Sequence, residues 1–180
     1  MQTDDELYQA FLQGDISAMD TLALRHRVHL MTYLNTILHS HEDAEDMTME
    51  AFARIMAKRP NITAGSFRAY LYQTARHLAF RFMRKYRLEH TGLDELEIPE
   101  YRTAEDTVLD AEKGRILHRC LSQMEDTVRE ALWLIYFENM SYMQAAKIMR
   151  VTNKKIDNLL TKGKRLLRAE LEKEGITDAE

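Results

Sequence analysis

Apolar residues recur at intervals of three and four over most of the chain, the spacing that places side chains on one face of an α-helix. Asp15 is a favourable N-cap residue, and the apolar stripe after it predicts a long helix ending near Leu38. A second stripe runs from Ala44 to Ile55, in a helix that must end before Pro60. The alternation typical of β-strands is not found. The predicted fold class is therefore all-α.

Further segments have the same helical period. A short helix is predicted over about Asp5–Leu12, and another begins after Ser66 and runs to about Leu88. In the second half, helices are predicted over about Ala104–Ser122 and Glu125–Phe137. Two more helices follow, joined by a very short turn.

Composition excludes several classes of protein. The chain has 180 residues, of which 45% are hydrophobic, and a formal net charge of -4, which is typical of a globular protein. Its longest apolar run, Ala131–Phe137, is too short to cross a bilayer, so no membrane insertion is expected. The acidic N-terminus lacks the features of a secretory signal, and Cys120 is the only cysteine. A cytoplasmic protein without disulfides is expected.

Charge is unevenly distributed along the chain. The stretch Glu89–Glu112 holds nine acidic residues against one base, Arg102. Its neighbours are basic: Phe67–His90 holds six bases against one acid, and Lys147–Lys173 holds nine bases against three acids. The sequence therefore predicts two small helical domains, residues 1–90 and 105–175, joined by an acidic linker over residues 91–104.

The most informative segment lies near the C-terminus. Ser141 is a good N-cap for a first helix that contains the small residues Ala145 and Ala146. Val151 lies in the turn, and the next helix is expected to bury Ile156 and neighbouring leucines. Two helices joined by so short a turn, with small residues where they cross, are typical of a helix-turn-helix.

The second helix of this pair has a basic outward face. Its predicted outward residues are Asn153, Lys154, Lys155, Asp157, Asn158, Thr161, Lys162, Lys164 and Arg165. Lysine and arginine neutralise phosphates, while asparagine and lysine can contact base edges. A solvated face of an ordinary helical hairpin is the alternative. DNA binding is favoured because the turn length, the apolar pattern and the basic face agree.

Aromatic residues alternate with cations over Phe67–Arg87. Unpaired bases stack on aromatic rings, at about 1–3 kcal/mol per base, while cations hold the phosphates. This segment therefore suits DNA that is being opened. The alternative is that many of these rings only fill the core of the domain.

The segment His39–Asp46 is rich in potential metal ligands. The two histidines are expected before a helix and the acids around its first turn, so the side chains do not converge and no metal is predicted. The helix that follows carries more apolar residues than one core face needs, so a protein-binding role is open. No catalytic motif is found, and neither an enzymatic activity nor a cofactor is predicted.

These segments together resemble the extracytoplasmic-function type of bacterial RNA polymerase sigma factor. The resemblance rests on DAEDMTMEAF (Asp43–Phe52), FRAYLYQTARHLAFRFMRK (Phe67–Lys85), the acidic linker, and the helix-turn-helix over Ser141–Arg168. It implies that residues 1–90 form region two, and residues 105–175 region four. It also implies a factor that directs core polymerase to promoters and promotes opening at minus ten.

The resemblance implies three sets of site residues. Core polymerase would bind, through its β′ clamp helices, to Asp43, Glu45, Asp46, Met49 and Phe52. The minus ten element would be contacted by Asn61, Thr63, Arg68, Tyr72, Arg76, His77, Arg81, Arg84 and Lys85. The minus thirty-five element would be contacted by Ser141, Thr152, Asn153, Lys154, Lys155, Asn158, Lys162 and Arg165. The β flap of polymerase and an anti-sigma factor are the further partners implied.

Some positions depart from the family pattern. The family often has Gln where Met49 stands, Asn where His77 stands and Asp where Arg81 stands. Arg150 occupies the place of the usual turn glycine, which predicts strain if its backbone is left-handed. Two alternatives to a sigma factor are a regulator that binds duplex DNA alone and a helical adaptor that binds a protein or RNA.

Overall fold

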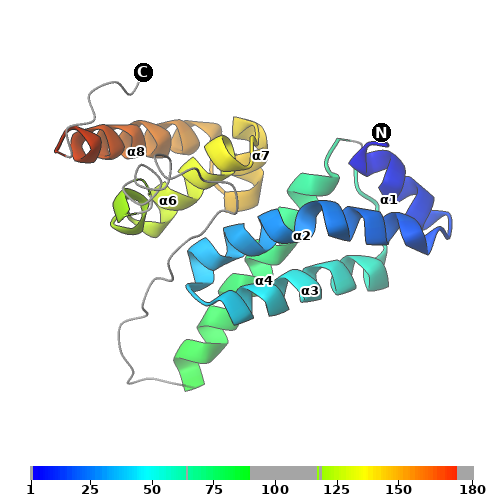
Figure 1. Cartoon of the computed structure of the whole chain (residues 1–180). Coiled ribbons are helices and arrows are strands. Elements are labelled where there is room, and N and C mark those ends of the chain that lie inside the picture. The colour runs from blue at the N-terminus through cyan, green and yellow to red at the C-terminus, as the bar shows by residue number, and fades with distance from the viewer. Residues whose placement is uncertain (1, 64, 90–116, 118, 174–180) are drawn as a thin grey trace, which may run out of the picture. The chain divides into compact units, whose positions relative to one another are not determined.

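A computed structural model of the protein describes residues 2–63, 65–89, 117 and 119–173. Within these ranges the chain forms helices and connecting segments without a strand, which confirms the predicted fold class (Figure 1). The chain divides into two compact units. The helices α1 to α4 build the first, and α6, η1, the start of α7 and α8 build the second.

The first two helices begin at polar caps. In α1 (Asp4–Leu12), Thr3 and Glu6 form a capping box, each side chain accepting a hydrogen bond from the backbone N–H of the other. In α2 (Ile16–Leu38), the Asp15 carboxylate accepts from the Ser17 N–H at 3.0 Å, which confirms the predicted N-cap. Each cap satisfies a backbone donor that has no partner within its helix.

The next two helices also follow the apolar pattern. In α3 (His41–Lys58), Ser40 is the N-cap, so His41 is the first helical residue and does not precede the helix as expected. The helix ends at Lys58, and its C-cap Arg59 has a left-handed backbone that leads into Pro60. The segment of residues 59–66 then connects α3 to α4 (Phe67–Glu89).

Packing among these four helices divides each into a buried and an outward face. The core contains Tyr8, Phe11, Met19, Leu22, Leu30, Leu34, Ile55, Phe67 and Leu71. Tyr33 of α2 and Tyr72 of α4 are fully buried, with ring centroids 5.1 Å apart. The large aromatic area that this pair buries fixes the rotation of α4, because turning the helix would expose Tyr72.

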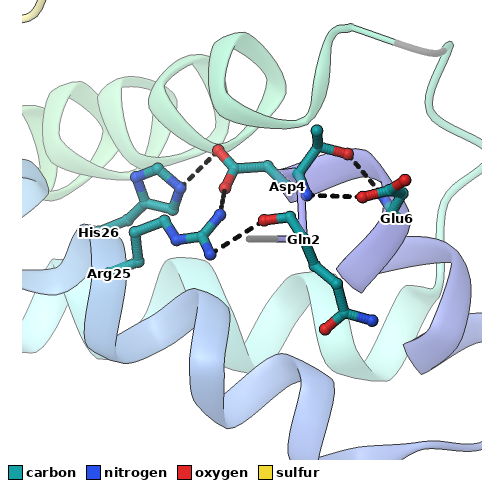
Figure 2. Close-up of polar contacts among 6 residues, drawn as sticks. Gln2, Asp4, Glu6, Arg25 and His26 are labelled. Carbon is teal, nitrogen blue, oxygen red and sulfur yellow. Dashed lines mark hydrogen bonds and ion pairs between the residues drawn. The ribbon is translucent and has the colours of Figure 1, made fainter.

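A polar cluster joins α1 to α2 (Figure 2). Asp4 accepts hydrogen bonds from Arg25 Nη1 at 2.5 Å and from His26 Nε2 at 2.7 Å. Arg25 also donates to the backbone carbonyl of Gln2 at 3.1 Å. Burial lowers the pKa of His26, and this effect outweighs the opposing attraction of Asp4. The neutral imidazole therefore donates Nε2–H to the carboxylate, whose charge is balanced by Arg25.

In the second unit, α6 (Asp126–Leu132) continues directly into the π-helical turn η1 (Trp133–Phe137). Arg129 is buried and donates to the carbonyls of Leu121, Ser122 and Met124 at 3.4–3.5 Å. One buried cation thus satisfies carbonyls at the end of the preceding helical residues. Its charge is paired with Asp126 at 2.5 Å.

The last two helices are α7 (Tyr142–Met149) and α8 (Asn153–Lys173). α8 packs against α6 at Gly163, where an added Cβ would lie 2.7 Å from Leu132 Cδ1 and 3.0 Å from Val128 Cγ1. The backbone at Gly163 is regular helix, so this position does not use the conformational freedom of glycine. Glycine is needed here because a side chain would prevent the close approach of α8 to α6. The contact fixes which face of α8 points outward.

Two parts of the sequence-based prediction concern residues outside these ranges. The acidic linker over residues 91–104 lies outside the described residues, as does most of the helix predicted over Ala104–Ser122. Leu117 and residues 119–122 of that helix are described and are helical. No helix in the described part of the chain is long and apolar enough to span a bilayer.

Replacing Gly163 with Ala is expected to destabilise the second unit by about 1–3 kcal/mol, because the new methyl group overlaps Leu132 and Val128. Urea unfolding of the full chain measures this change, with Thr161→Ala on the exposed side of α8 as the control. Helix propensity alone predicts the opposite sign, a gain of about 1 kcal/mol, and such a gain would show that the contact is not tight.

Acid is expected to destabilise the first unit through His26. Its folded pKa lies below the unfolded value of 6.5, so the unfolded state binds more protons as the pH falls. The stabilisation is present above the unfolded pKa and is lost as the pH drops through the folded pKa. Urea midpoints between about pH 7.5 and about pH 5.5 should fall less in His26→Gln than in the wild type. The exposed His77→Gln is the control, and its midpoint should fall as much as that of the wild type. An equal fall in His26→Gln and the wild type would contradict this prediction.

Candidate nucleic-acid interface

The turn between α7 and α8 has the geometry of a helix-turn-helix. The Ser141 hydroxyl accepts from the Gln144 N–H at 3.2 Å, which confirms the predicted cap of α7. Arg150 adopts a left-handed backbone with φ of 57°, the strained conformation expected where the turn glycine is replaced. The Val151 N–H then donates to the Ala146 carbonyl at 3.0 Å, which closes the turn.

The face of α8 opposite its core is cationic. Ile156, Leu159 and Leu160 are buried, as the sequence pattern predicts. The exposed residues of the first half of α8 and the turn before it include Thr152, Asn153, Lys154, Lys155 and Asn158. Arg165 is also exposed, one turn beyond Lys162. Most of these exposed side chains can donate hydrogen bonds, with one acid, Asp157, exposed among them.

Two lysines on α8 have partners within the second unit. Lys162 is half-buried and pairs with Glu125 at 2.8 Å, which lowers the pKa of that carboxyl. The Lys164 ammonium lies 5.4 Å from the centre of the Tyr136 ring. A hydrogen bond with Tyr136 raises the pKa of Lys164 and keeps it charged. A phosphate that contacts Lys162 must compete with Glu125.

α4 presents a second basic surface. Phe67, Leu71, Tyr72, Ala75 and Leu78 face the core. The exposed residues of this helix are His77, Phe80, Arg81, Arg84, Lys85 and Tyr86. Among its aromatic residues, Phe80 and Tyr86 are exposed, Tyr70 and Phe82 are half-buried, and Phe67 and Tyr72 are buried.

Cations and rings alternate on this outward face of α4. The Arg76 guanidinium lies 4.4 Å from the centre of the Phe80 ring, and the rings of Phe82 and Tyr86 stack with centroids 6.4 Å apart. Phe80 is 44% exposed and Tyr86 is 48% exposed. Exposed rings beside guanidinium and ammonium groups can stack unpaired bases while the cations hold the backbone. Paired bases offer no such ring contact.

The outward face of α3 combines acids with apolar side chains. Glu45 and Asp46 are exposed, Asp43 is half-buried, and Met49 is 65% exposed. A groove between α3 and α4 has Asp46 and Met49 on one wall and Arg81 with neighbouring residues on the other. Exposed methionines framed by charge are typical of a protein-binding surface. Among the described residues, no three ligand side chains converge on a metal site.

Comparison with known families decides the identity of the chain. Residues 22–89 match Sigma-70 region 2, and residues 114–167 match Sigma-70, region 4, which together cover more than half of the sequence. The chain belongs to the sigma-70 family. Its relatives place it among sigma factors of the extracytoplasmic-function (ECF) type.

Individual relatives agree over most of their length. The sigma factor is 24% identical to the ECF RNA polymerase sigma factor SigM of Bacillus subtilis, over 98% of this chain and 99% of that protein. It is 26% identical to the RNA polymerase sigma-H factor of Pseudomonas aeruginosa, over 83% of each chain.

Solved structures show the same fold. The sigma factor RpoE, in complex with the anti-sigma factor NepR from Bartonella quintana, matches with a TM-score of 0.74 and 20% identity, over 87% of this chain and 98% of that chain. CnrH, in complex with the cytosolic domain of CnrY, matches with a TM-score of 0.68 and 18% identity, over 94% of this chain and 97% of that chain.

Membership of this family sets aside the regulator that acts alone and the helical adaptor. A sigma factor works with core RNA polymerase and promoter DNA, and it is an initiation factor and not an enzyme. The partners that the family shows are therefore core RNA polymerase and promoter DNA.

Two residues that the sequence assigned to binding surfaces lie in the core of the sigma factor. Tyr72 is fully buried against Tyr33, so it cannot reach DNA in this structure. Phe52 is only 6% exposed on the inner side of α3, so the acids and Met49 are the accessible members of the set predicted to bind polymerase. In both cases an aromatic ring fills space that the four-helix core must close.

Some of the remaining predicted site residues are exposed to solvent, and others make contacts within the protein. Asn61 and Thr63 are exposed on the segment before α4, and Arg68 and Arg76 are half-buried with their guanidinium groups near the Tyr72 and Phe80 rings. Ser141 and Thr152 are exposed, but their hydroxyls accept hydrogen bonds from helix backbones.

The sequence-based site lists left out Phe80 and Tyr86, the two exposed rings on α4. The signal for Phe80 was its helical phase, because it lies four residues after Arg76. Tyr86 lies fourteen positions after Tyr72 and has nearly the same helical phase, so its exposure near the end of α4 had no such signal.

Lys155 and Lys162 should contribute differently to the salt dependence of promoter binding. Lys155→Ala should flatten the log-log slope by about one unit, because the side chain is exposed and free to contact a phosphate. Lys162→Ala should change it less, because Glu125 already neutralises that charge. Anisotropy of labelled promoter duplex with reconstituted holoenzyme measures both slopes. The same flattening in Lys173→Ala, whose lysine pairs with Glu170 near the end of α8, would contradict a specific contact.

Proposed function

We propose that this sigma factor binds core RNA polymerase, directs it to specific promoters and promotes strand opening at the minus ten element. In this proposal, residues 1–90 act as region two, residues 91–104 as the linker and residues 105–175 as region four. The family matches over residues 22–89 and 114–167 fall within those limits and support the division. The protein acts in the cytoplasm, where polymerase works.

The observation that carries the proposed opening step is the outward face of α4. Phe80 and Tyr86 are nearly half exposed, the Arg76 guanidinium lies 4.4 Å from the centre of the Phe80 ring, and Arg81, Arg84 and Lys85 are exposed on the same stretch of the helix. A base leaving the duplex loses its stacking neighbours and recovers about 1–3 kcal/mol on such a ring. The surface therefore stabilises single-stranded DNA relative to duplex, which is what promoter opening requires.

The second DNA contact is assigned to α8. Its exposed first half carries Asn153, Lys154, Lys155 and Asn158 after a short turn, an arrangement that suits insertion into a major groove. The amides can contact base edges while the lysines neutralise phosphates. Region four then sets the position of the complex upstream, at minus thirty-five, and region two acts on the DNA downstream.

The third contact is assigned to the outward face of α3, with Asp43, Glu45, Asp46 and Met49 against the β′ clamp helices. The β flap is the partner assigned to region four. The two structural relatives are both held in complexes, one of them with an anti-sigma factor, which supports an inhibitory protein partner for this chain too.

Run-off transcription with reconstituted holoenzyme tests the proposed function. Core enzyme should transcribe a subset of a library of upstream sequences only when this protein is added. Permanganate should then modify thymines at minus ten in the selected promoters. A protein that neither joins core enzyme nor selects any promoter would contradict the proposal.

Met49→Arg should weaken the affinity for core polymerase by at least about tenfold, because it places a bulky cation at the centre of the α3 face. Ile16→Arg is the matched control, since Ile16 is 62% exposed on α2 and lies outside that face. Titration of labelled protein with core enzyme measures both. Equal affinities for the two variants would remove α3 from the interface.

A further inference from the structure

The first helix of the chain has no role assigned by the family match, which begins at residue 22. In the structure, α1 nevertheless contacts the segment of residues 59–66, which connects α3 to α4. Two side-chain hydrogen bonds and a cation-π contact join these two parts of the first unit, and both parts line one pocket. They lie about fifty to sixty positions apart in sequence.

Both ends of the connecting segment are hydrogen-bonded to α1. The Tyr8 hydroxyl donates to the Pro60 carbonyl at 2.7 Å, across 52 positions. The Gly65 N–H donates to the Asp5 carboxylate, across 60 positions. Tyr8 is buried and Pro60 is half-buried, so this hydrogen bond is partly shielded from solvent. Backbone groups at the two ends of a loop thus take their partners from one helix.

Packing reinforces these hydrogen bonds. The Arg59 guanidinium lies 5.0 Å from the centre of the Phe11 ring. Ile62, in the middle of the segment, is only 7% exposed and lines a cavity with Tyr8 and Gln9 of α1. The segment is therefore held to α1 at its start and its end, while its middle residue, Ile62, is buried beside a pocket that α1 also lines.

α1 is itself held in place. Its capping box orders the first turn, and Asp4 binds Arg25 and His26 of α2 (Figure 2). The Tyr8 ring packs against Phe67 at the start of α4, with centroids 5.1 Å apart. Because α1 is fixed to both α2 and α4, it can restrain a loop and not merely move with it.

The outward side of the same segment carries Asn61 and Thr63. Both are exposed, on either side of the buried Ile62. Burying Ile62 against α1 directs its two neighbours away from α1. Gly65 has a φ of 77°, a conformation that other residues rarely adopt, so the chain can turn here into α4. Asn and Thr side chains can bond to the edge of an unpaired base.

We propose that α1 is a brace that holds Asn61 and Thr63 in position to contact an unpaired base of the minus ten strand, and that Asp5 and Tyr8 are positioning residues for this contact. The inference rests on the proposed function. A loop that is ordered before DNA arrives loses less conformational entropy on binding, so bracing raises affinity without any contact between α1 and DNA.

The hydrogen bond of Asp5 gives the first test. Amide hydrogen exchange of the full-length protein should be slow at Gly65 and should speed up in Asp5→Ala, with the exposed Asp20→Asn as a charge control. Tyr8→Phe removes only the hydroxyl and keeps the packed ring. It therefore tests the hydrogen bond to the Pro60 carbonyl with little change to the core.

Binding to single-stranded DNA gives the decisive test. Wild-type holoenzyme is first used to select an oligonucleotide from a pool of random single-stranded DNA, and the enriched sequence is the probe for all variants. Asp5→Ala combined with Tyr8→Phe should weaken probe binding by about tenfold, on the scale of one base contact, while core affinity stays unchanged. In a background of Asn61→Ala with Thr63→Ala, the same pair should have no further effect.

Two results would overturn the inference: unchanged probe affinity in the α1 variant, or an equal loss in both backgrounds, which would mean that α1 does not act through Asn61 and Thr63. Failure of the proposed function is distinguishable, because then the wild-type protein would not join core enzyme or would enrich no oligonucleotide at all.

Discussion

The division of α4 and α8 into one buried and one cationic face is the constraint on which DNA binding by this protein depends. In α4 the division is set by Tyr72, whose ring packs against that of Tyr33 at an interplanar angle of 38°, while Phe80 is left exposed. In α8 it is set by Gly163, which lets the helix approach Leu132 closely. Burial of apolar area thus decides which side chains of these helices are exposed and which are not.

Polar groups then shape the surfaces that packing leaves exposed. Arg129 satisfies carbonyls in the second unit, and side-chain caps begin the helices of the helix-turn-helix. In the first unit, Asp4, Asp5 and Tyr8 of α1 connect α2 and the segment before α4. These contacts bury little apolar area, but they satisfy buried or terminal backbone groups. They therefore fix loops that hydrophobic packing alone would leave variable.

Much of the fold could be predicted from sequence because helical period and caps are local signals. Asp15 and Ser141 act as the caps that the sequence indicates. The rotation of a helix about its axis was harder to predict from sequence, since a segment of mixed aromatic and cationic residues has several plausible buried faces. Tyr72 and Phe52 were therefore placed on the surface when they lie in the core. The bonds of α1 to residues 60 and 65 have no local signature, because they join positions far apart in the chain.

Site-specific DNA cleavage tests the central claim most directly. A cysteine replaces Asn158 of α8 in one variant and His77 of α4 in another, with the buried Cys120 changed to Ala in both, and each carries an iron chelate that cuts nearby DNA. In holoenzyme on one promoter, the α8 probe should cut around minus thirty-five and the α4 probe around minus ten. Cuts by both probes at one place, or no localised cuts from either, would contradict the account.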